Sequence, residues 1–156
     1  MATIVKRDKD EGEAISMLGG TYLVRAAGEE TDNQLTVMEM HIPAGSGPPP
    51  HTHPGGEAVY VLEGTIRYHI DGETVEGGPG SFFYVPAGTT ENFEPTSEVR
   101  LLVMYTPGGI DQFFREAGEP GQAGQLPPPP ESAPDLERIA AIGRKYGMDI
   151  QAPAEA

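Results

Sequence analysis

The residues best suited to chemistry lie together at residues 45–64, in the sequence GSGPPPHTHPGGEAVYVLEG. His51 and His53 are two residues apart, and Glu57 follows four residues later. In an extended chain alternate side chains share a face, so the two imidazoles are expected to point the same way. The Glu57 carboxylate opens the next apolar run and can complete a set of three ligands. Two imidazoles and one carboxylate form a site for a divalent metal ion with coordination positions left open.

The elements that must position these ligands are predicted to be short strands. The chain has 21 glycines and 16 prolines, and they fall between short runs rich in Val, Ile, Tyr and Phe. This spacing is typical of an all-β barrel or sandwich. Asp71-Gly72 predicts a tight hairpin turn. The expected strands cover residues 21–26, 34–42, 57–62, 65–70, 73–76, 81–85, 91–94 and 99–106.

The strand that begins at Glu57 is apolar on both faces. Val59 and Val61 share a face with Glu57. The other face carries Ala58, Tyr60 and Leu62. A strand with one face in water would alternate apolar and polar side chains along its length. We therefore expect one face to line a barrel interior and the other to be covered by terminal segments or by a second subunit, which predicts a homodimer.

Composition divides the chain into three segments. Residues 1–15 are predicted to be a flexible polar arm, and residues 16–107 a single barrel. Residues 108–156 are predicted to be a helical and proline-rich extension that packs on the barrel. Within it, residues 110–117 and 132–146 suit short helices, because their apolar residues recur at helical spacing.

The bulk composition excludes several classes of function. With 156 residues the chain can build one real core. It carries 10 basic and 24 acidic residues, a net charge of −14, which repels phosphate backbones and anionic lipids. We therefore expect neither a nucleic acid nor a membrane as partner. There is no cysteine, which excludes thiolate chemistry and fits a reducing compartment. The first residues lack the apolar core of a signal peptide, so the cytoplasm is the expected location.

The stretch around the histidines resembles the first motif of the cupin family, G-x5-H-x-H-x3-E-x6-G. Every gap matches when the motif is filled by Gly45, His51, His53, Glu57 and Gly64. The flanking strands, and the later sequence FFREAGEP, are similar to small single-domain cupins of the quercetin-dioxygenase-like type. The resemblance implies a single jelly-roll β-barrel, here with short C-terminal helices, that is usually dimeric and holds a metal ion at its mouth.

The second cupin motif, G-x5-P-x-G-x2-H-x3-N, is matched only in part. Gly80, Pro86 and Gly88 stand at its first three positions. At the fourth position the family has a histidine that ligates the metal, and this chain has Glu91. At the last position the family has an asparagine, and this chain has Pro95.

The resemblance implies a ligand set of His51, His53, Glu57 and Glu91. The family's usual three histidines and one glutamate hold Fe, Mn, Ni, Cu or Zn. Two carboxylates would neutralise a divalent ion, which makes it a weaker Lewis acid and favours Fe(II), Mn(II) or Zn(II) over Cu, with Ni possible. The alternative for the first three residues is a cupin that has kept them and lost the metal.

Glu91 has three possible roles. It can be the fourth ligand, it can be an unligated acid or base whose pKa is set by burial beside the metal, or it can be a solvated loop carboxylate. The last role would leave a site of three ligands, the two histidines and Glu57.

Residues that could line a pocket lie on the predicted strands. Met38, Met40 and Ile42 share one strand face and are expected to be core or an adaptable apolar pocket. His41 and His69 lie outside both motifs, and we expect them on the outer face or at a dimer contact. Candidate aromatic walls are Tyr60, Tyr68, Phe82, Phe83 and Tyr84.

The resemblance implies a metal-dependent enzyme that acts on a small organic molecule, aromatic or enolic. Its most specific form is a quercetinase-like dioxygenase, in which Glu91 is a ligand or takes a phenolic or enolic proton. One alternative is an oxygen-independent lyase, isomerase or cyclase of secondary metabolism that uses the same site. Another is a cupin that binds a small molecule without catalysis.

Overall fold

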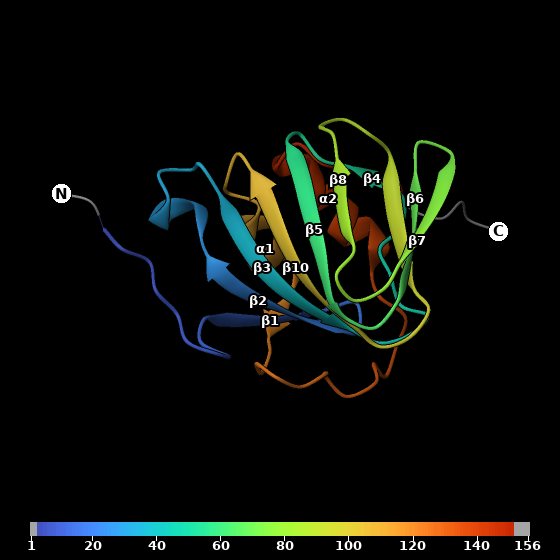
Figure 1. Cartoon of the computed structure of the whole chain (residues 1–156), viewed down its shortest axis with the longest axis horizontal. Helices are drawn as coiled ribbons and strands as arrows, with labels where there is room; N and C mark the ends of the chain where they lie inside the picture. The colour runs from blue at the N-terminus through green and yellow to red at the C-terminus, as the bar shows by residue number, and fades with distance from the viewer. Residues whose placement is uncertain (1–2, 152–156) are drawn as a thin grey trace.

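The short apolar runs fold into strands close to the positions that their alternation predicts (Figure 1). The computed structural model describes residues 3–151; residues 1–2 of the expected arm and 152–156 of the expected extension lie outside the described residues. The helices are α1 (Asp111–Ala117) and α2 (Leu136–Lys145), with one 3-10 turn, η1 (Gly28–Glu30). The strands are β1 (Glu13–Met17), β2 (Gly20–Ala26), β3 (Thr36–Ile42), β4 (His51–Thr52), β5 (Gly56–Glu63), β6 (Ile66–Ile70), β7 (Glu73–Gly77), β8 (Phe82–Val85), β9 (Glu91–Pro95), β10 (Val99–Thr106), β11 (Glu119–Pro120) and β12 (Asp149–Ile150).

These strands form two antiparallel sheets. The larger has the order β11-β1-β2-β3-β10-β5-β8, and the smaller has the order β12-β4-β9-β6-β7. The pairings of β3 with β10, β4 with β9, β5 with β8 and β6 with β7 are nested one inside the next along the chain. This nesting is the connectivity of a jelly roll. The predicted all-β fold with short C-terminal helices is confirmed.

The inner faces of the sheets bury the core. On β3 and β10 buried residues alternate with partly exposed ones, the pattern of a sheet with one face on the core. Val59 and Val61 of β5 are fully buried, on the face that they share with Glu57. On the other face Tyr60 and Leu62 are 41% and 40% exposed, so the terminal segments do not cover these two side chains.

The predicted hairpin joins β6 and β7. Asp71 has a φ of 47° and Gly72 a φ of 82°. Two consecutive positive φ angles define the type I′ turn, whose twist matches that of the flanking strands. This turn explains why the register from Ile66 to Ile70 against β7 has no bulge.

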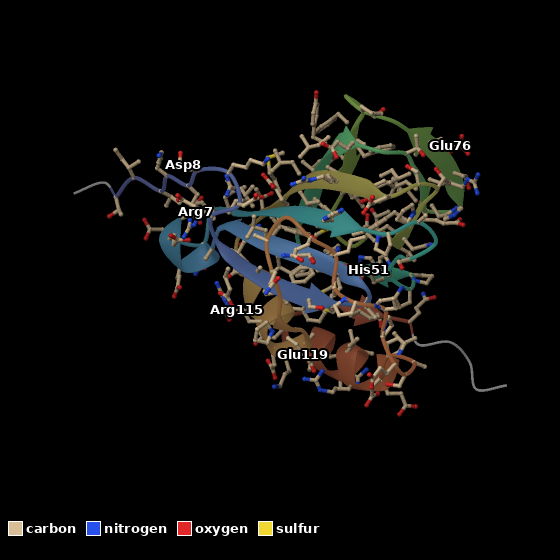
Figure 2. All side chains as sticks on the ribbon, turned by 90° about the horizontal axis from the view of Figure 1, so that it is seen from below. Arg7, Asp8, His51, Glu76, Arg115 and Glu119 are labelled. Carbon is tan, nitrogen blue, oxygen red and sulfur yellow. The ribbon has the colours of Figure 1, made fainter. Side chains whose placement is uncertain are left out.

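Both helices lie on one side of the sheets (Figure 2). Helix α2 begins at Leu136, four residues later than the sequence suggests, because Asp135 is its N-cap and accepts a 3.0 Å hydrogen bond from the Arg138 N–H. No helix among residues 3–151 is long and apolar enough to cross a membrane.

Four short strands were not predicted from the alternation. β4, β11 and β12 have two residues each, too few to show a period. The fourth, β1, starts at Glu13, inside the segment that was expected to be an arm. The division of the chain into three segments stays a prediction.

Candidate metal centre

Four side chains with metal-ligating atoms meet between the two sheets. His51 on β4 and Glu91 on β9 are direct cross-strand partners in the smaller sheet. His53 follows β4 in the loop, and Glu57 lies near the start of β5 in the larger sheet. All four residues are between 1% and 6% exposed. Figure 2 shows His51 on the side of the sheets that faces the helices.

The ligating atoms are close enough to share one ion. The two histidine Nε2 atoms are 2.9 Å apart. Glu91 Oε1 lies 3.2 Å from His51 Nε2 and 3.3 Å from His53 Nε2, and Glu57 Oε2 lies 3.1 Å from His53 Nε2. One ligating atom from each residue can be chosen so that all lie within 4.8 Å of one another. Atoms bound at about 2.1 Å from a common ion are about 3.0 to 3.4 Å apart at right-angled or tetrahedral geometry.

Three of the four carboxylate oxygens in the cluster lack a hydrogen-bond partner. Glu57 Oε2 and both carboxylate oxygens of Glu91 are buried with no hydrogen bond within the described chain. An ionised oxygen buried without a partner is costly unless a cation compensates it. Imidazole nitrogens and carboxylate oxygens are the donors that Fe, Mn and Zn ions accept. These residues therefore fit a divalent metal ion.

Neighbouring groups orient the ligands. His51 Nδ1 lies 2.8 Å from the Pro49 carbonyl, which assigns the proton to Nδ1 and leaves the Nε2 lone pair facing the cluster. The Gly88 N–H donates a 2.9 Å hydrogen bond to the His53 carbonyl, and Gly88 has a φ of 74°, which a glycine adopts without strain. The partial match to the second cupin motif therefore has a structural role, since its turn holds the loop of the first motif.

Burial and charge shift the pKa values of the cluster. Burial lowers the pKa of His53, but contacts with Glu57 and Glu91 outweigh this and raise it to about 9. Burial raises the pKa of Glu57 to about 7, and the charge of Glu91 adds to the rise. Burial also acts to raise the pKa of Glu91, but contacts with His51 and His53 outweigh it and hold that pKa well below its usual range. The metal-free cluster at neutral pH thus carries a proton on His53 and a negative charge on Glu91.

A small inner cavity adjoins the ligands. Its volume is about 50 Å³ and its wall is mostly apolar. Met40 lines it, as the pocket hypothesis predicts, whereas Met38 and Ile42 belong to the core. The C-terminal segment closes one side with Ile139, Met148 and Ile150.

A larger outer cleft of about 400 Å³ is also lined by His53. Asn33, Gln112 and Tyr146 bring polar side chains to it. Tyr105 lines both the cleft and the inner cavity and was not among the residues predicted from the sequence. The sequence signal that could have identified Tyr105 was its position on the last predicted strand. The register of β10 against β5 then sets Tyr105 directly opposite Glu57.

The structure corrects the expected aromatic wall. Phe82 and Tyr84 are 61% and 58% exposed on the outer face of β8, and neither lines the cavities beside the ligands. Phe83 turns inward instead, with its ring centroid 5.0 Å from that of Tyr68. Tyr68 is fully buried and donates a long, 3.4 Å hydrogen bond to Glu57 Oε1. None of the five predicted wall residues lines either cavity, since Tyr68 and Phe83 pack in or against the core. Tyr60, Phe82 and Tyr84 face outward, because alternation alone does not say which face is inside.

The two other histidines lie away from the cluster. His41 pairs with Glu98 at 3.0 Å, and His69 Nδ1 lies 3.0 Å from Thr74 Oγ1. Neither lines the inner cavity or the outer cleft. The set of His51, His53, Glu57 and Glu91 is therefore made without them.

A family model described as a cupin domain matches residues 38–105, which include all four clustered residues. The chain belongs to the cupin superfamily. Quercetin 2,3-dioxygenase of Bacillus subtilis is 32% identical to this cupin over 127 residues, 79% of this chain and 38% of that protein. This cupin thus spans about two fifths of the length of that relative.

Solved structures agree on the fold of this cupin. The polyketide cyclase RemF from Streptomyces resistomycificus is 21% identical, with a TM-score of 0.58 over 80% of this chain and 88% of that one. An RmlC-like cupin from Shewanella frigidimarina is 18% identical, with a TM-score of 0.59 over 69% of this chain and 96% of that one. At these identities the likeness concerns the fold alone.

Proposed function

We propose that this cupin is a metal-dependent enzyme that acts on a small aromatic or enolic molecule, and that its reaction is a quercetinase-like dioxygenation. The observation that carries the proposal is the convergence of His51, His53, Glu57 and Glu91 in a buried cluster, in which three of the four carboxylate oxygens lack a hydrogen-bond partner. The 32% identity to a quercetin 2,3-dioxygenase supports the type of reaction, over 38% of that protein's length.

These four side chains would hold the ion, with Fe(II), Mn(II) or Zn(II) favoured by the paired carboxylates and Ni(II) possible. When bound, the ion supplies a positive charge that polarises a substrate oxygen. Glu91 serves as a ligand or takes the phenolic or enolic proton. Tyr68 orients Glu57 through its hydroxyl, and the apolar wall keeps bulk water from the reacting atoms.

The test is metal content followed by oxygen consumption. The protein is purified with and without air, its metals are quantified, and the Fe(II)- and Mn(II)-loaded forms are mixed with quercetin in an oxygen electrode. We expect one ion per chain and flavonol-dependent oxygen uptake, both lost in a His51→Ala, His53→Ala variant. A wild-type chain that takes up no stoichiometric metal would overturn the proposal.

The second candidate is an oxygen-independent lyase, isomerase or cyclase. Glu91 favours it, because a buried carboxylate stands where the family has a histidine ligand. Turnover under anaerobic conditions separates this candidate from the dioxygenase. A cupin that binds a small molecule without catalysis would show metal and ligand binding but no turnover in air or without it.

We further propose that a second copy of the chain covers the outer face of β5 and β8. Leu62, Phe82 and Tyr84 are exposed there, and β8 is the edge of the larger sheet. Contiguous exposed apolar side chains at a sheet edge are typical of an interaction surface. A homodimer built on this face leaves the metal centre on the opposite side of the sheet free to work in each subunit.

A further inference from the structure

Among residues 3–151, the two cavities beside the metal centre share two lining residues, His53 and Tyr105. His53 belongs to the ligand cluster, so Tyr105 is the remaining side chain that faces both spaces. The outer cleft, at about 400 Å³, falls in the size range of small-molecule sites, whereas the inner cavity, at about 50 Å³, has room for only a few atoms. A ligand with a ring body in the cleft and an oxygen at the metal would therefore pass Tyr105.

Tyr105 is placed close to the reacting centre. It lies on β10 directly opposite Glu57 of β5, on the inward face of the sheet. Its ring centroid is 5.4 Å from that of His53. Only 5% of the residue is exposed.

The Tyr105 hydroxyl has no hydrogen bond to another described residue, unlike the hydroxyls of Tyr68 and Tyr146. The Tyr22 hydroxyl has none either, but Tyr22 lines the inner cavity and not the outer cleft. The Tyr68 hydroxyl donates to Glu57, and the Tyr146 hydroxyl donates to Glu116 at 2.7 Å. The Tyr105 hydroxyl is not among the fully buried side-chain atoms that lack a partner, so it faces cavity space rather than packed protein. An unpaired hydroxyl at the boundary of two cavities is therefore available to a ligand.

We propose that Tyr105 is a specificity-determining residue, whose hydroxyl hydrogen-bonds an oxygen atom of the substrate while the ring body of the substrate occupies the outer cleft. This inference rests on the proposed function, since it assumes an oxygenated aromatic or enolic substrate at the metal centre. It adds a recognition group that neither cupin motif contains. It also predicts the pose, with the oxygenated end inward and the apolar rings toward Gly108 and Gln112 of the cleft.

The test uses 3-hydroxyflavone as the probe and the Zn(II)-loaded full chain under anaerobic conditions, so that binding is measured without turnover. Binding is followed by the shift of the flavonol absorption band. We expect Tyr105→Phe to raise the dissociation constant about tenfold and to move the band of the bound probe, since one hydrogen bond to the ligand oxygen is lost. Zn(II) content and the unfolding temperature are expected to stay unchanged.

Two controls make the result specific. Tyr60→Phe removes a phenol hydroxyl from the outer face of β5, away from both cavities, and is expected to bind the probe as the wild type does. Flavone, which lacks the 3-hydroxyl group, is expected to bind wild type and Tyr105→Phe with the same low affinity.

The outcomes separate the two proposals. Equal affinity of wild type and Tyr105→Phe for 3-hydroxyflavone overturns the role of Tyr105 and leaves the proposed function standing. A wild-type Zn(II) form that does not bind the probe overturns both the substrate class and the role of Tyr105. A Tyr105→Phe variant that loses Zn(II) along with the probe shows that the hydroxyl supports the fold or the metal, and this also overturns the inference.

Discussion

Glu91 is the residue in which this cupin departs most from its family, and its environment narrows its role. The residue is 1% exposed and faces two imidazoles, so it is not a solvated loop carboxylate. With Glu57 it places two carboxylates in one buried site, which would be unfavourable without positive charge nearby. A protonated His53 supplies that charge in the metal-free cluster, and a divalent ion would supply more of it.

Replacing Glu91 with glutamine tests its role as a ligand. Glu91→Gln keeps the shape of the side chain but removes its charge, so we expect the affinity for Mn(II) or Zn(II) to fall at least about tenfold in a calorimetric titration. Glu94→Gln is the matched control, because Glu94 is exposed on the same strand and should leave the affinity unchanged. Unaltered affinity in Glu91→Gln would exclude Glu91 from the ligand set.

Glu91→His distinguishes a ligand from an acid or base. The variant restores the family's set of three histidines and one glutamate, so we expect it to bind metal at least as well as the wild type. If Glu91 takes the substrate proton, turnover collapses while the metal stays bound. Turnover at the wild-type rate would show that the carboxylate does not move that proton.

The raised pKa values predict how metal binding depends on pH. Metal competes with the proton on His53, whose pKa is about 9, and with the proton on Glu57, whose pKa is about 7. Between pH 7 and 9 the metal ion must displace the proton on His53, so the logarithm of the metal affinity is expected to rise by about one per pH unit. Below pH 7 the second proton steepens the slope to about two. Calorimetry in several buffers measures how many protons are released on metal binding in each pH range. A metal affinity that does not change from pH 6 to 9 would contradict the assignment.

At the scale of elements, the metal loop depends on the end of the chain. β4 is only two residues long, and it is held between β9 and β12. Ile150 of β12 is the cross-strand partner of His51, and the Gln151 N–H donates a 2.9 Å hydrogen bond to the Pro50 carbonyl. The C-terminal segment therefore helps to set where the first histidine lies, besides closing the inner cavity.

Ile150→Ala tests this dependence. Ile150 is buried against Gly143 and lines the inner cavity, so its truncation is expected to lower the free energy of unfolding by about 2 to 4 kcal/mol and to weaken metal binding through His51. Asp149→Ala is the control on the same strand, because that side chain is exposed. Denaturant unfolding and metal titration are the measurements. An Ile150→Ala variant as stable as Asp149→Ala would show that β12 is only loosely attached.

At the scale of the whole molecule, the exposed face of β5 and β8 determines the expected assembly. We expect the wild type to be a dimer by light scattering after size exclusion, and Phe82→Glu to be a monomer, since a charge at the centre of an apolar interface is strongly unfavourable. Val75→Glu is the control, because Val75 is an exposed apolar residue on β7, outside this face. A monomeric wild type would refute the homodimer.

Much of the fold follows from local patterns in the sequence. The strand from Val99 to Thr106 was predicted with its observed bounds, and Asp71-Gly72 specified its turn, because alternation and turn chemistry act over a few residues. β4 and β12 could not be predicted in the same way. They exist only because each pairs with a segment far away in the chain.

The sequence by itself determined the ligand candidates, since the spacing of His51, His53 and Glu57 and the substitution at Glu91 are visible in the order of residues. Only the tertiary structure decided that Glu91 is buried opposite His51, that Phe82 and Tyr84 face outward, and that Tyr105 faces Glu57. The physical reason is that alternation states which residues share a face, whereas the choice of the inner face depends on how the two sheets pack against each other.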